Sequence, residues 1–443
     1  MAWSYGLVRG SLDADDRRKI ESRLLRPAAD VIRSHKMGIH NIQCWKNSAV
    51  GLAGFATGAQ ELVKEAIDDP DRGFRVQIAK GVHDGIWWEG SLGYHAYTMQ
   101  ALWPLAEAAR VAGTDLYSDL YRSLYDGPLD VALPNGDAPG FNDNAGAPVS
   151  SLASLYELAF ARWKMPAYGM IAGSGRRESV ESLLWGSPEA PRGNPVPAES
   201  RVLREIGFAV LRSPRLTAAV RFGTHGGGHG HPDKLNVVTF GAGRQLGLDP
   251  GSINYGVPLH AGWYRTTIAH NTVTVDGASQ SNADGRLDQW ESSSEPRVTK
   301  LVASAPGAYA GVLLRRSLKL DAAGRFEDRF ECVSESEHVY DWAFHAPGVL
   351  SVSVDLKERA EPLGGTNGYQ HLTKVRAGRT GEAWTAEWRG ESGPPLVLKV
   401  DGAPDTEVFT AVGPGRDPLD AVPALIVRRR ARGTVFGVVH QVG

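Results

Sequence analysis

Hydrophobic residues in the first part of the chain recur at the three- and four-residue spacing of amphipathic helices. Residues 15–34 show this spacing, with Asp13 or Asp15 as the predicted N-cap, and Pro27 is expected to kink or divide the helix. Further helices are predicted between Gly, Pro and Asp residues, at positions 47–57, 60–67, 74–82, 94–112 and 149–163. Residues 1–185 therefore predict a domain of helical hairpins with almost no strand.

The periodicity changes after a segment rich in Pro and Gly. Residues 186–200 have the composition of a linker. Beyond them, short runs of β-branched and aromatic residues predict strands at 207–211, 216–222, 235–240, 270–275, 312–320, 338–345 and 424–440. Many strands without intervening helices predict packed antiparallel sheets, so residues 201–443 are expected to form a β-sandwich. The run Arg428–Arg432 is interpreted as a solvated turn between the last two strands.

Composition narrows the class of protein without naming a ligand. A chain of 443 residues with 42% hydrophobic and 22% charged residues can bury a large core and is long enough for two or three domains. The formal net charge is only -2, so any attraction for an acidic partner must be local to a cleft. We expect neither a nucleic acid nor a membrane as partner, and the oligomeric state cannot be predicted.

The cysteines and the N-terminal residues are the sequence features that indicate the cellular compartment of the protein. Cys44 and Cys332 are the only cysteines, so no disulfide framework is predicted and both are expected to be buried thiols. The first residues lack a signal-peptide pattern, and no apolar stretch approaches the length of a membrane span. We expect a soluble protein, periplasmic or secreted if a signal has been removed and otherwise cytoplasmic.

A glycine-rich loop with three histidines, residues 225–234, is the strongest candidate for chemistry. His229 and His231 are two positions apart, so in an extended segment both imidazoles face one pocket. Residues 268–275 alternate like a strand, which places His270 on its more polar face. With Asp249, His231 and His270 form a set of ligands that suits Zn²⁺. The alternative is a polar cleft lined by hydrogen-bonded histidines.

Several longer runs resemble one enzyme family. HGHPDKLNVVTFGAGRQLGLDPGSINYG and WYRTTIAHNTVTVDG are similar to the C-terminal part of heparinase II/III-type polysaccharide lyases, and DGIWWEGSLGYHAYTMQALWPLAEAAR resembles their helical part. YDWAFHAPG and PALIVRRRARGTVFGVVHQ fit the sheet domain of the same family. The resemblance lies near the oligoalginate and exolytic heparin lyase branches. It implies an incomplete α/α toroid before the β-sandwich, and an acidic polysaccharide or oligosaccharide as substrate.

The resemblance also implies a reaction. A uronate lyase takes the proton from the carbon that bears the carboxylate and expels the oxygen on the neighbouring carbon, leaving a double bond. This β-elimination needs a base, an acid and a group that neutralises the carboxylate. Tyr94 and His229 are the predicted acid and base. Predicted substrate contacts are Tyr97, Trp88, Glu89, Tyr255 and Arg265, the last as a bidentate partner of a uronate.

The predicted carboxylate-neutralising segment departs from the family pattern. It contains Lys46 and Asn47 in the run NIQCWKNSA, where related enzymes commonly have His after Trp. A protonated Lys can neutralise a carboxylate but cannot act as a base. Asn47 is a predicted donor to the carboxylate, and its alternative role is that of a helix cap or core amide. If Zn²⁺ is bound, it is expected to hold the loops in place, because elimination requires no hydrolytic water.

Two other functions compete with the lyase. The first is a glycoside hydrolase on an α/α toroid, with Asp84 and Glu89 as its carboxylate pair. The second is a non-catalytic carbohydrate-binding protein, with Trp87, Trp88 and Trp263 as stacking platforms. A hydrolase would release reducing ends without a double bond, and a binding protein would show affinity without turnover. The predicted function is β-elimination on alginate or a heparin-like polymer, in exolytic mode.

Overall fold

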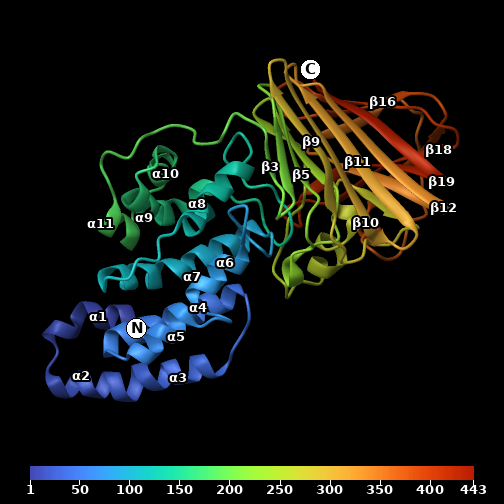
Figure 1. Ribbon diagram of the computed structural model, residues 1–443. Coiled ribbons are helices and arrows are strands. Elements are labelled where there is room, and N and C mark those ends of the chain that lie inside the picture. Colours follow the sequence, from blue (N-terminus) through green and yellow to red (C-terminus); the bar gives the residue numbers. More distant parts are fainter. The chain divides into compact units, whose positions relative to one another are not determined.

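The computed structural model describes residues 1–443, which fold into two compact units (Figure 1). The helical unit comprises Met1–Trp88, Leu92–Pro128 and Leu152–Arg192. The β unit comprises Glu89–Ser91, Leu129–Ser151 and Gly193–Gly443. The chain leaves the helical unit for the last time after Arg192, inside the predicted linker. The β unit also takes two segments that come earlier in the chain than this linker.

Helices account for nearly all of the regular structure in the first 185 residues. The long helix α7 packs against α4, and α4 packs in turn against α5. Four short or interrupted helices, α1, α8, α10 and α11, were not predicted. The elements are α1 (Ala2–Val8), α2 (Ala14–Ile20), α3 (Arg26–Ser34), α4 (Asn41–Thr57), α5 (Gln60–Asp68), α6 (Phe74–Gly81), α7 (Leu92–Val111), α8 (Asp119–Val131), α9 (Ala153–Trp163), α10 (Pro166–Ala172) and α11 (Val180–Trp185), with a hairpin of β1 (Val82–His83) and β2 (Ile86–Trp87) before α7.

The predicted helix at residues 15–34 forms as α2 and α3. Asp13 is the N-cap, and its side chain accepts a hydrogen bond of 2.8 Å from the backbone N–H of Asp16. Pro27 lies in the first turn of α3, and a π-helical turn, Glu21–Leu25, joins the two helices. A wide turn before a proline relieves the clash of its ring with the preceding carbonyl groups. The predicted division at Pro27 therefore takes the form of this π turn.

The smaller sheet of the β unit is antiparallel and has the order β3-β4-β5-β6-β7. Every residue of β4, β5 and β6 is buried, so both faces of this sheet are covered. This explains why its sequence is a continuous apolar run without strict alternation. Its strands are β3 (Arg201–Leu203), β4 (Phe208–Arg212), β5 (Leu216–Arg221), β6 (Asn236–Gly241) and β7 (Arg244–Gly247).

The larger sheet has twelve strands, with β12 and β19 at its centre (Figure 1). Strand β11 alternates between buried and half-buried residues, as expected for a sheet with one face in a core. Leu211 and Val220 of the small sheet join Leu314 and Phe330 of the large sheet in one hydrophobic cluster, which confirms the β-sandwich. The strands are β8 (Val273–Val275), β9 (Arg286–Ser294), β10 (Arg297–Tyr309), β11 (Val312–Asp321), β12 (Phe326–His345), β13 (Val349–Val352), β14 (Lys357–Glu358), β15 (Thr373–Thr380), β16 (Trp384–Arg389), β17 (Leu396–Val400), β18 (Thr406–Pro414) and β19 (Ala421–Val442).

The arginine run does not form the predicted turn. It lies inside β19, which continues unbroken from Ala421 to Val442. Arg428 forms two hydrogen bonds with Asp341 of β12, of 2.7 and 2.8 Å, and the buried Arg429 donates to Thr406 at 3.0 Å. The turn prediction was wrong because the partners of these charges lie on other strands and are invisible in the local sequence.

The predicted strand at residues 268–275 was also only partly right. Thr267–Ala269 forms a 3-10 turn, and β8 covers only Val273–Val275. His270 therefore precedes the strand. Cys44 and Cys332 are free and buried, as predicted. None of the helices combines the length and apolar character needed to cross a bilayer.

Candidate active site

The carboxylate of Asp143, in the β unit, connects several of the predicted site residues. Its Oδ2 atom lies 3.0 Å from Nδ1 of His229 and accepts a hydrogen bond of 2.8 Å from the Tyr255 hydroxyl. The same hydroxyl lies 3.0 Å from His229 Nδ1. His229 and Tyr255, both predicted from the sequence, are thus brought together by an aspartate that was not predicted.

The other oxygen of Asp143 has three partners of its own. Oδ1 accepts a hydrogen bond of 2.9 Å from the Ser252 hydroxyl and lies 3.0 Å from His231 Nε2 and 3.2 Å from His260 Nε2. We call these five partners and Asp143 the Asp143 cluster. His229 and His231 contact the two oxygens of one carboxylate, but His229 ends a 3-10 turn, so the extended segment on which their common orientation was predicted does not form.

Local backbone geometry holds the histidine loop against Asp143. Gly226 and Gly227 have φ angles of 89° and 62°, and a side chain at Gly226 would lie 2.2 Å from the carbonyl oxygen of Glu89. These two glycines lead into the 3-10 turn Gly227–His229. The backbone N–H of Asp143 donates to the carbonyl of His229 at 3.1 Å. The glycine content of the loop therefore serves close packing as well as flexibility.

The electrostatics of the cluster favour an ionised Asp143. Burial raises the pKa of this carboxyl group, but the hydrogen bonds from His229 and His231 outweigh burial and hold the pKa well below its usual range. Burial lowers the pKa of His231, against an opposing hydrogen bond to Asp143. Asp143 is therefore an anion at neutral pH, and His231 is a neutral imidazole beside it.

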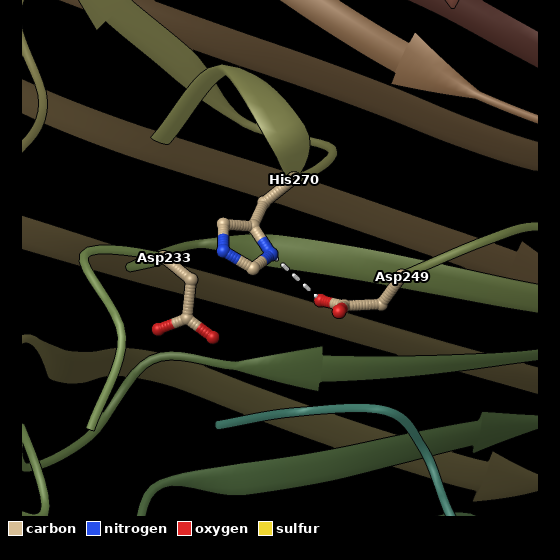
Figure 2. A group of neighbouring side chains, drawn as sticks. All are labelled: Asp233, Asp249 and His270. Atoms are coloured by element: carbon tan, nitrogen blue, oxygen red, sulfur yellow. Dashed lines mark hydrogen bonds and ion pairs between the residues drawn. The ribbon is translucent and has the colours of Figure 1, made fainter. Parts of the chain in front are cut away.

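A second buried cluster consists of Asp233, Asp249 and His270 (Figure 2). One ligand atom of each residue lies within 4.8 Å of the others, and His270 Nδ1 is 2.9 Å from Asp249 Oδ2. Asp233 Oδ1 accepts a hydrogen bond of 2.9 Å from Arg221. Burial raises the pKa of Asp233, but the charge of Arg221 outweighs burial and leaves the pKa below its usual range. The cluster thus places two buried carboxyl groups beside one buried imidazole.

The predicted zinc ligands are only partly within this second cluster. Asp249 and His270 belong to it. The imidazole of His231 lies beside it, and the centroids of the His231 and His270 rings are 5.5 Å apart. The buried atoms without a hydrogen-bond partner include His231 Nδ1, His270 Nε2 and Asp233 Oδ2. Two imidazole nitrogens and a carboxylate oxygen are common ligands of zinc, so these residues fit the ion. Asp233 was not predicted as a member of the site.

The helical unit carries the predicted tyrosines at the start of α7. The rings of Tyr94 and Tyr97 are 6.2 Å apart, and Tyr97 is 5.3 Å from Trp45 of α4. His95 fixes this end of the helix, because its Nδ1 accepts from the N–H of Trp87 at 3.1 Å. Burial lowers the pKa of His95 to about 4, so this imidazole is neutral. The first turn of α7, which carries both tyrosines, is thus held by a buried histidine.

Lys46 and Asn47 of α4 already have partners within the helical unit. Lys46 Nζ donates to the carbonyl of His35 at 2.5 Å. The Asn47 side chain is buried, donates to the carbonyl of Arg72 at 2.6 Å and accepts from Gln43 at 2.8 Å. These contacts match the alternative role of Asn47 as a core amide. Its contact with a substrate carboxylate stays a prediction, as does that of Lys46.

The other predicted substrate contacts differ in their surroundings. Glu89 is buried in the β unit, with its Oε1 atom 3.7 Å from His229 Nε2. Arg265 donates to the carbonyl of Gly230 at 2.8 Å and so braces the histidine loop. Trp88 is half-buried in the helical unit. Trp87 and Trp263 are completely buried, so neither is a sugar-stacking platform as the binding-protein alternative requires.

Sequence reasoning missed Asp143, Ser252, His260 and Asp233. Asp143 is 86 positions from His229 in the chain, and no short spacing links the two residues. Its only local signal is a polar run, Asn142–Asn144, in a segment bounded by Gly140 and Gly146. Asp233 stands inside the histidine loop itself. Its position in the predicted site loop was the signal that would have found it.

Comparison with protein-family models places the chain in a family. The model described as "Heparinase II/III-like, C-terminal" matches residues 195–416, and that described as "Alginate lyase" matches residues 8–130. The first match spans half of the chain and contains most of the Asp143 cluster and all of the second cluster. The chain belongs to the heparinase II/III-like family.

Individual relatives agree with this assignment. An alginate lyase of Stenotrophomonas maltophilia (strain K279a) is 28% identical over 486 residues, which cover 91% of this chain and 63% of that protein. An exo-oligoalginate lyase of Saccharophagus degradans is 24% identical, covering 86% of this chain and 59% of that protein. The chain thus spans about three fifths of the length of these relatives.

Solved structures share the fold. The heparan sulfate lyase HepC from Pedobacter heparinus superposes with a TM-score of 0.70 at 17% identity, covering 94% of this chain and 62% of that one. A crystal structure of heparinase III gives a TM-score of 0.70 at 14% identity, covering 94% of this chain and 63% of that one. These likenesses support the predicted fold class, a helical toroid, here incomplete, followed by an antiparallel β-sandwich.

Proposed function

We propose that this protein is a polysaccharide lyase that cleaves a uronate-containing polysaccharide or oligosaccharide by β-elimination. The observation that carries the proposal is the hydrogen-bonded group of His229, Tyr255 and ionised Asp143. An imidazole held by a carboxylate and a phenol is suited to moving a proton near neutral pH. The names of the two relatives, an alginate lyase and an exo-oligoalginate lyase, point to the same class of reaction.

His229 carries the first proton-transfer role in this proposal. Its side chain is 19% exposed, so a sugar can reach the ring, whereas His231 is completely buried. Tyr94 takes the second role by family resemblance. Tyr255 is a further candidate for that second role because it is an exposed residue whose hydroxyl already contacts His229. Substitution of each tyrosine by Phe separates the two candidates, because Phe keeps the ring and removes only the hydroxyl.

Zn²⁺ is the proposed metal of the second cluster. His231, Asp249 and His270 would hold it, with Asp233 beside them, and the ion would supply a fixed positive charge that draws the loops together. In this role the ion stabilises the fold around Asp143 and takes no part in proton transfer. Metal analysis of the purified protein tests this directly. One zinc per chain, lost in His270→Ala, is expected, and a metal-free wild-type protein would contradict it.

The proposed substrate is alginate or a heparin-like polymer, cleaved exolytically. Both features rest on resemblance to the relatives. Product sizes during the first few per cent of the reaction distinguish the modes of cleavage. An exolytic enzyme releases short unsaturated products at once, whereas endolytic cleavage would produce a broad range of intermediate lengths.

Ultraviolet absorbance of the conjugated uronate double bond tests the proposed activity. The panel comprises alginate, heparin, heparan sulfate, hyaluronan, chondroitin and glucuronan oligomers. We expect absorbance to rise on one class of substrate, and His229→Ala and Tyr94→Phe to lower the rate by about 100-fold or more. Reducing ends that accumulate without absorbance would instead indicate the hydrolase, and binding without either signal would indicate a carbohydrate-binding protein.

A further inference from the structure

Arg416 differs from the other arginines whose buried nitrogens lack a hydrogen-bond partner. Such nitrogens occur in Arg212, Arg221, Arg244, Arg315 and Arg416. Each of the first four forms a hydrogen bond or an ion pair through another of its nitrogens. The guanidinium of Arg416 forms neither, although its Nε and Nη2 atoms are buried. Its positive charge therefore has no counter-charge in contact.

The turn between β18 and β19, which carries Arg416, is fixed in place. The backbone N–H of Gly415 donates to the carbonyl of Asp420 at 3.0 Å. The hydroxyl of Tyr264, a completely buried residue, donates to the carbonyl of Gly415 at 2.8 Å. The backbone next to Arg416 is therefore held both by the turn itself and by a buried side chain from another part of the β unit.

The guanidinium of Arg416 lies against the segment that carries Asp143. A side chain at Gly146 would lie 2.7 Å from both Cζ and Nη2 of Arg416, and the φ angle of Gly146 is 73°. This glycine thus leaves the space that the guanidinium fills. Gly146 is three residues after Asp143, and three residues span at most about 11 Å. Arg416 is therefore a cation beside the Asp143 cluster.

The surroundings of Arg416 suit an anion that comes from outside the protein. Asp249 and Asp137 act on its charge electrostatically, but neither forms an ion pair with it. Arg416 is half-buried, and Nη1 is the nitrogen of its guanidinium that is not fully buried. An accessible guanidinium nitrogen forms strong, charge-assisted hydrogen bonds with carboxylates.

Arg265, the arginine that the sequence predicts as a partner of a uronate, is already engaged. Its Nη2 atom donates to the carbonyl of Gly230 at 2.8 Å. A ligand that drew this nitrogen away would leave a carbonyl group without its donor, which costs free energy. Arg416 has no such bond to lose. It is therefore better suited than Arg265 to receive a carboxylate from a ligand.

We infer that Arg416 is a substrate-binding residue that pairs with a uronate carboxylate of the acidic saccharide. The inference rests on the proposed function for the identity of the ligand. Arg416 holds a sugar unit through its charge and takes no part in proton transfer, because an arginine side chain stays protonated. A saccharide without carboxylates offers this residue no ionic partner.

Calorimetric titration tests the pairing without rapid turnover. His229→Ala and His229→Ala/Arg416→Gln are titrated with tetrasaccharides of alginate, heparan sulfate, hyaluronan and chondroitin. For the tetrasaccharide that binds most tightly to His229→Ala, we expect the second substitution to weaken binding by about 10-fold or more. The same tetrasaccharide with its carboxylates reduced to alcohols should bind both proteins with equal affinity. Equal affinities for the acidic tetrasaccharide would overturn the inference, as would an equal loss for the reduced one.

Arg244→Gln in the same His229→Ala background is the matched control. Arg244 is also half-buried, has a buried Nε without a partner and packs against Gly390, where a side chain would lie 3.2 Å from its Cζ. Unlike Arg416, it donates to the carbonyl of Pro394, at 2.9 Å. The control is expected to keep the affinity of His229→Ala. Equal losses in the two arginine variants would count against a specific role for Arg416.

Steady-state kinetics of single variants separates binding from proton transfer. Arg416→Gln should raise KM by about 10-fold and change kcat by less than about threefold. Arg416→Lys keeps the charge and loses the planar fork, so its KM should lie between those of wild type and Arg416→Gln. A fall in kcat at unchanged KM would overturn the inference. If Arg416→Gln does not fold, a wild-type KM in Arg416→Lys would do the same.

These measurements separate failure of this inference from failure of the proposed function. An active enzyme whose KM is the same in Arg416→Gln contradicts the role of Arg416 and leaves the lyase in place. Binding that depends on Arg416, without formation of a double bond, contradicts the lyase and leaves Arg416 as a saccharide-binding residue. A wild-type protein that neither binds nor cleaves any of these saccharides contradicts both.

Discussion

Replacement of Arg316 by Met perturbs the part of the sandwich core that supports both candidate clusters. Arg316 lies on β11, is completely buried and forms two hydrogen bonds with Asp328 of β12, of 2.8 and 2.5 Å. Its third nitrogen, Nη1, donates to the carbonyls of Leu235 and Asn271, at 2.5 and 2.6 Å. Leu235 follows the histidine loop and Asn271 follows His270. One guanidinium group therefore holds the backbone on both sides of the site.

The expected loss of stability follows from these contacts. Removal of one partner of a buried ion pair typically lowers the free energy of unfolding by about 4 kcal/mol, because the other charge remains buried. Two carbonyl groups also lose their donor, and each unsatisfied buried group costs about 1 kcal/mol or more. Because such terms do not add fully, we expect Arg316→Met to lower the free energy of unfolding by about 4 kcal/mol at neutral pH.

The loss should depend on pH. Burial raises the pKa of Asp328, but the charge of Arg316 outweighs it and lowers the pKa from 3.8 to about 2. In the wild type this carboxylate contributes its full stability at pH values above the pKa of Asp328 in the unfolded chain. The contribution is lost as the pH falls through the folded pKa of about 2. In Arg316→Met, burial dominates and raises the folded pKa of Asp328 above the unfolded value. That raised pKa makes the variant relatively more stable in acid, so its deficit narrows as pH falls from about 7 toward 4.

Urea unfolding followed by tryptophan fluorescence measures this difference. The wild type, Arg316→Met and the double variant Arg316→Met/Asp328→Leu are compared at neutral and mildly acidic pH. The double variant should recover more than half of the loss, because no buried charge remains. A loss below about 1 kcal/mol, or a deficit that does not change with pH, would refute the reasoning.

Three further predictions concern the site loops. Asn271→Ala removes the amide that donates to the carbonyls of Val237 and Leu248, at 2.8 and 3.1 Å, and should lower the free energy of unfolding by about 3 kcal/mol in urea titrations. Gly251→Ala places a side chain 2.3 Å from the carbonyl oxygen of Asn144 at a φ angle of 72°, and should cost about 2 kcal/mol, seen as a lower Tm in calorimetry. Chelation of the proposed zinc should lower Tm in wild-type protein, with recovery on adding Zn²⁺, and should leave the Tm of His270→Ala unchanged. A Gly251→Ala protein as stable as wild type, or equal Tm values before and after chelation, would contradict these expectations.

Local periodicity was sufficient for much of the fold. The helices at residues 60–67 and 74–82 and the strands at 216–222 and 312–320 agree with α5, α6, β5 and β11 to within one or two residues. These elements have strong patterns that tertiary contacts reinforce. The segment 268–275 deviates because the turn Thr267–Ala269, which overlaps its start, is held by side-chain contacts such as the hydrogen bond from the Thr267 hydroxyl to the carbonyl of Pro232 at 2.6 Å.

The candidate site was predictable only where its residues share a short stretch of sequence. His229 and His231 stand in one glycine-rich loop, so their proximity was visible in the sequence, although the loop forms a 3-10 turn at His229 and not the extended segment that the prediction assumed. Asp143 becomes their partner through the packing of a distant segment, which no spacing in the chain reveals. For the same reason, Asp341 could not be recognised as the partner that keeps Arg428 inside β19. In both cases the two interacting residues are far apart in the sequence, so no local pattern predicts that they meet.

The most direct test of the proposed function follows the fate of oxygen during cleavage. Alginate oligomers, or whichever uronate oligomer the absorbance panel identifies, are digested in water labelled with heavy oxygen, and the products are weighed by mass spectrometry. Elimination predicts an unsaturated product at the new non-reducing end and no label incorporated by cleavage into either fragment, after correction for slow exchange at the reducing end. Saturated products that carry the label from the first turnover would contradict the lyase and establish hydrolysis.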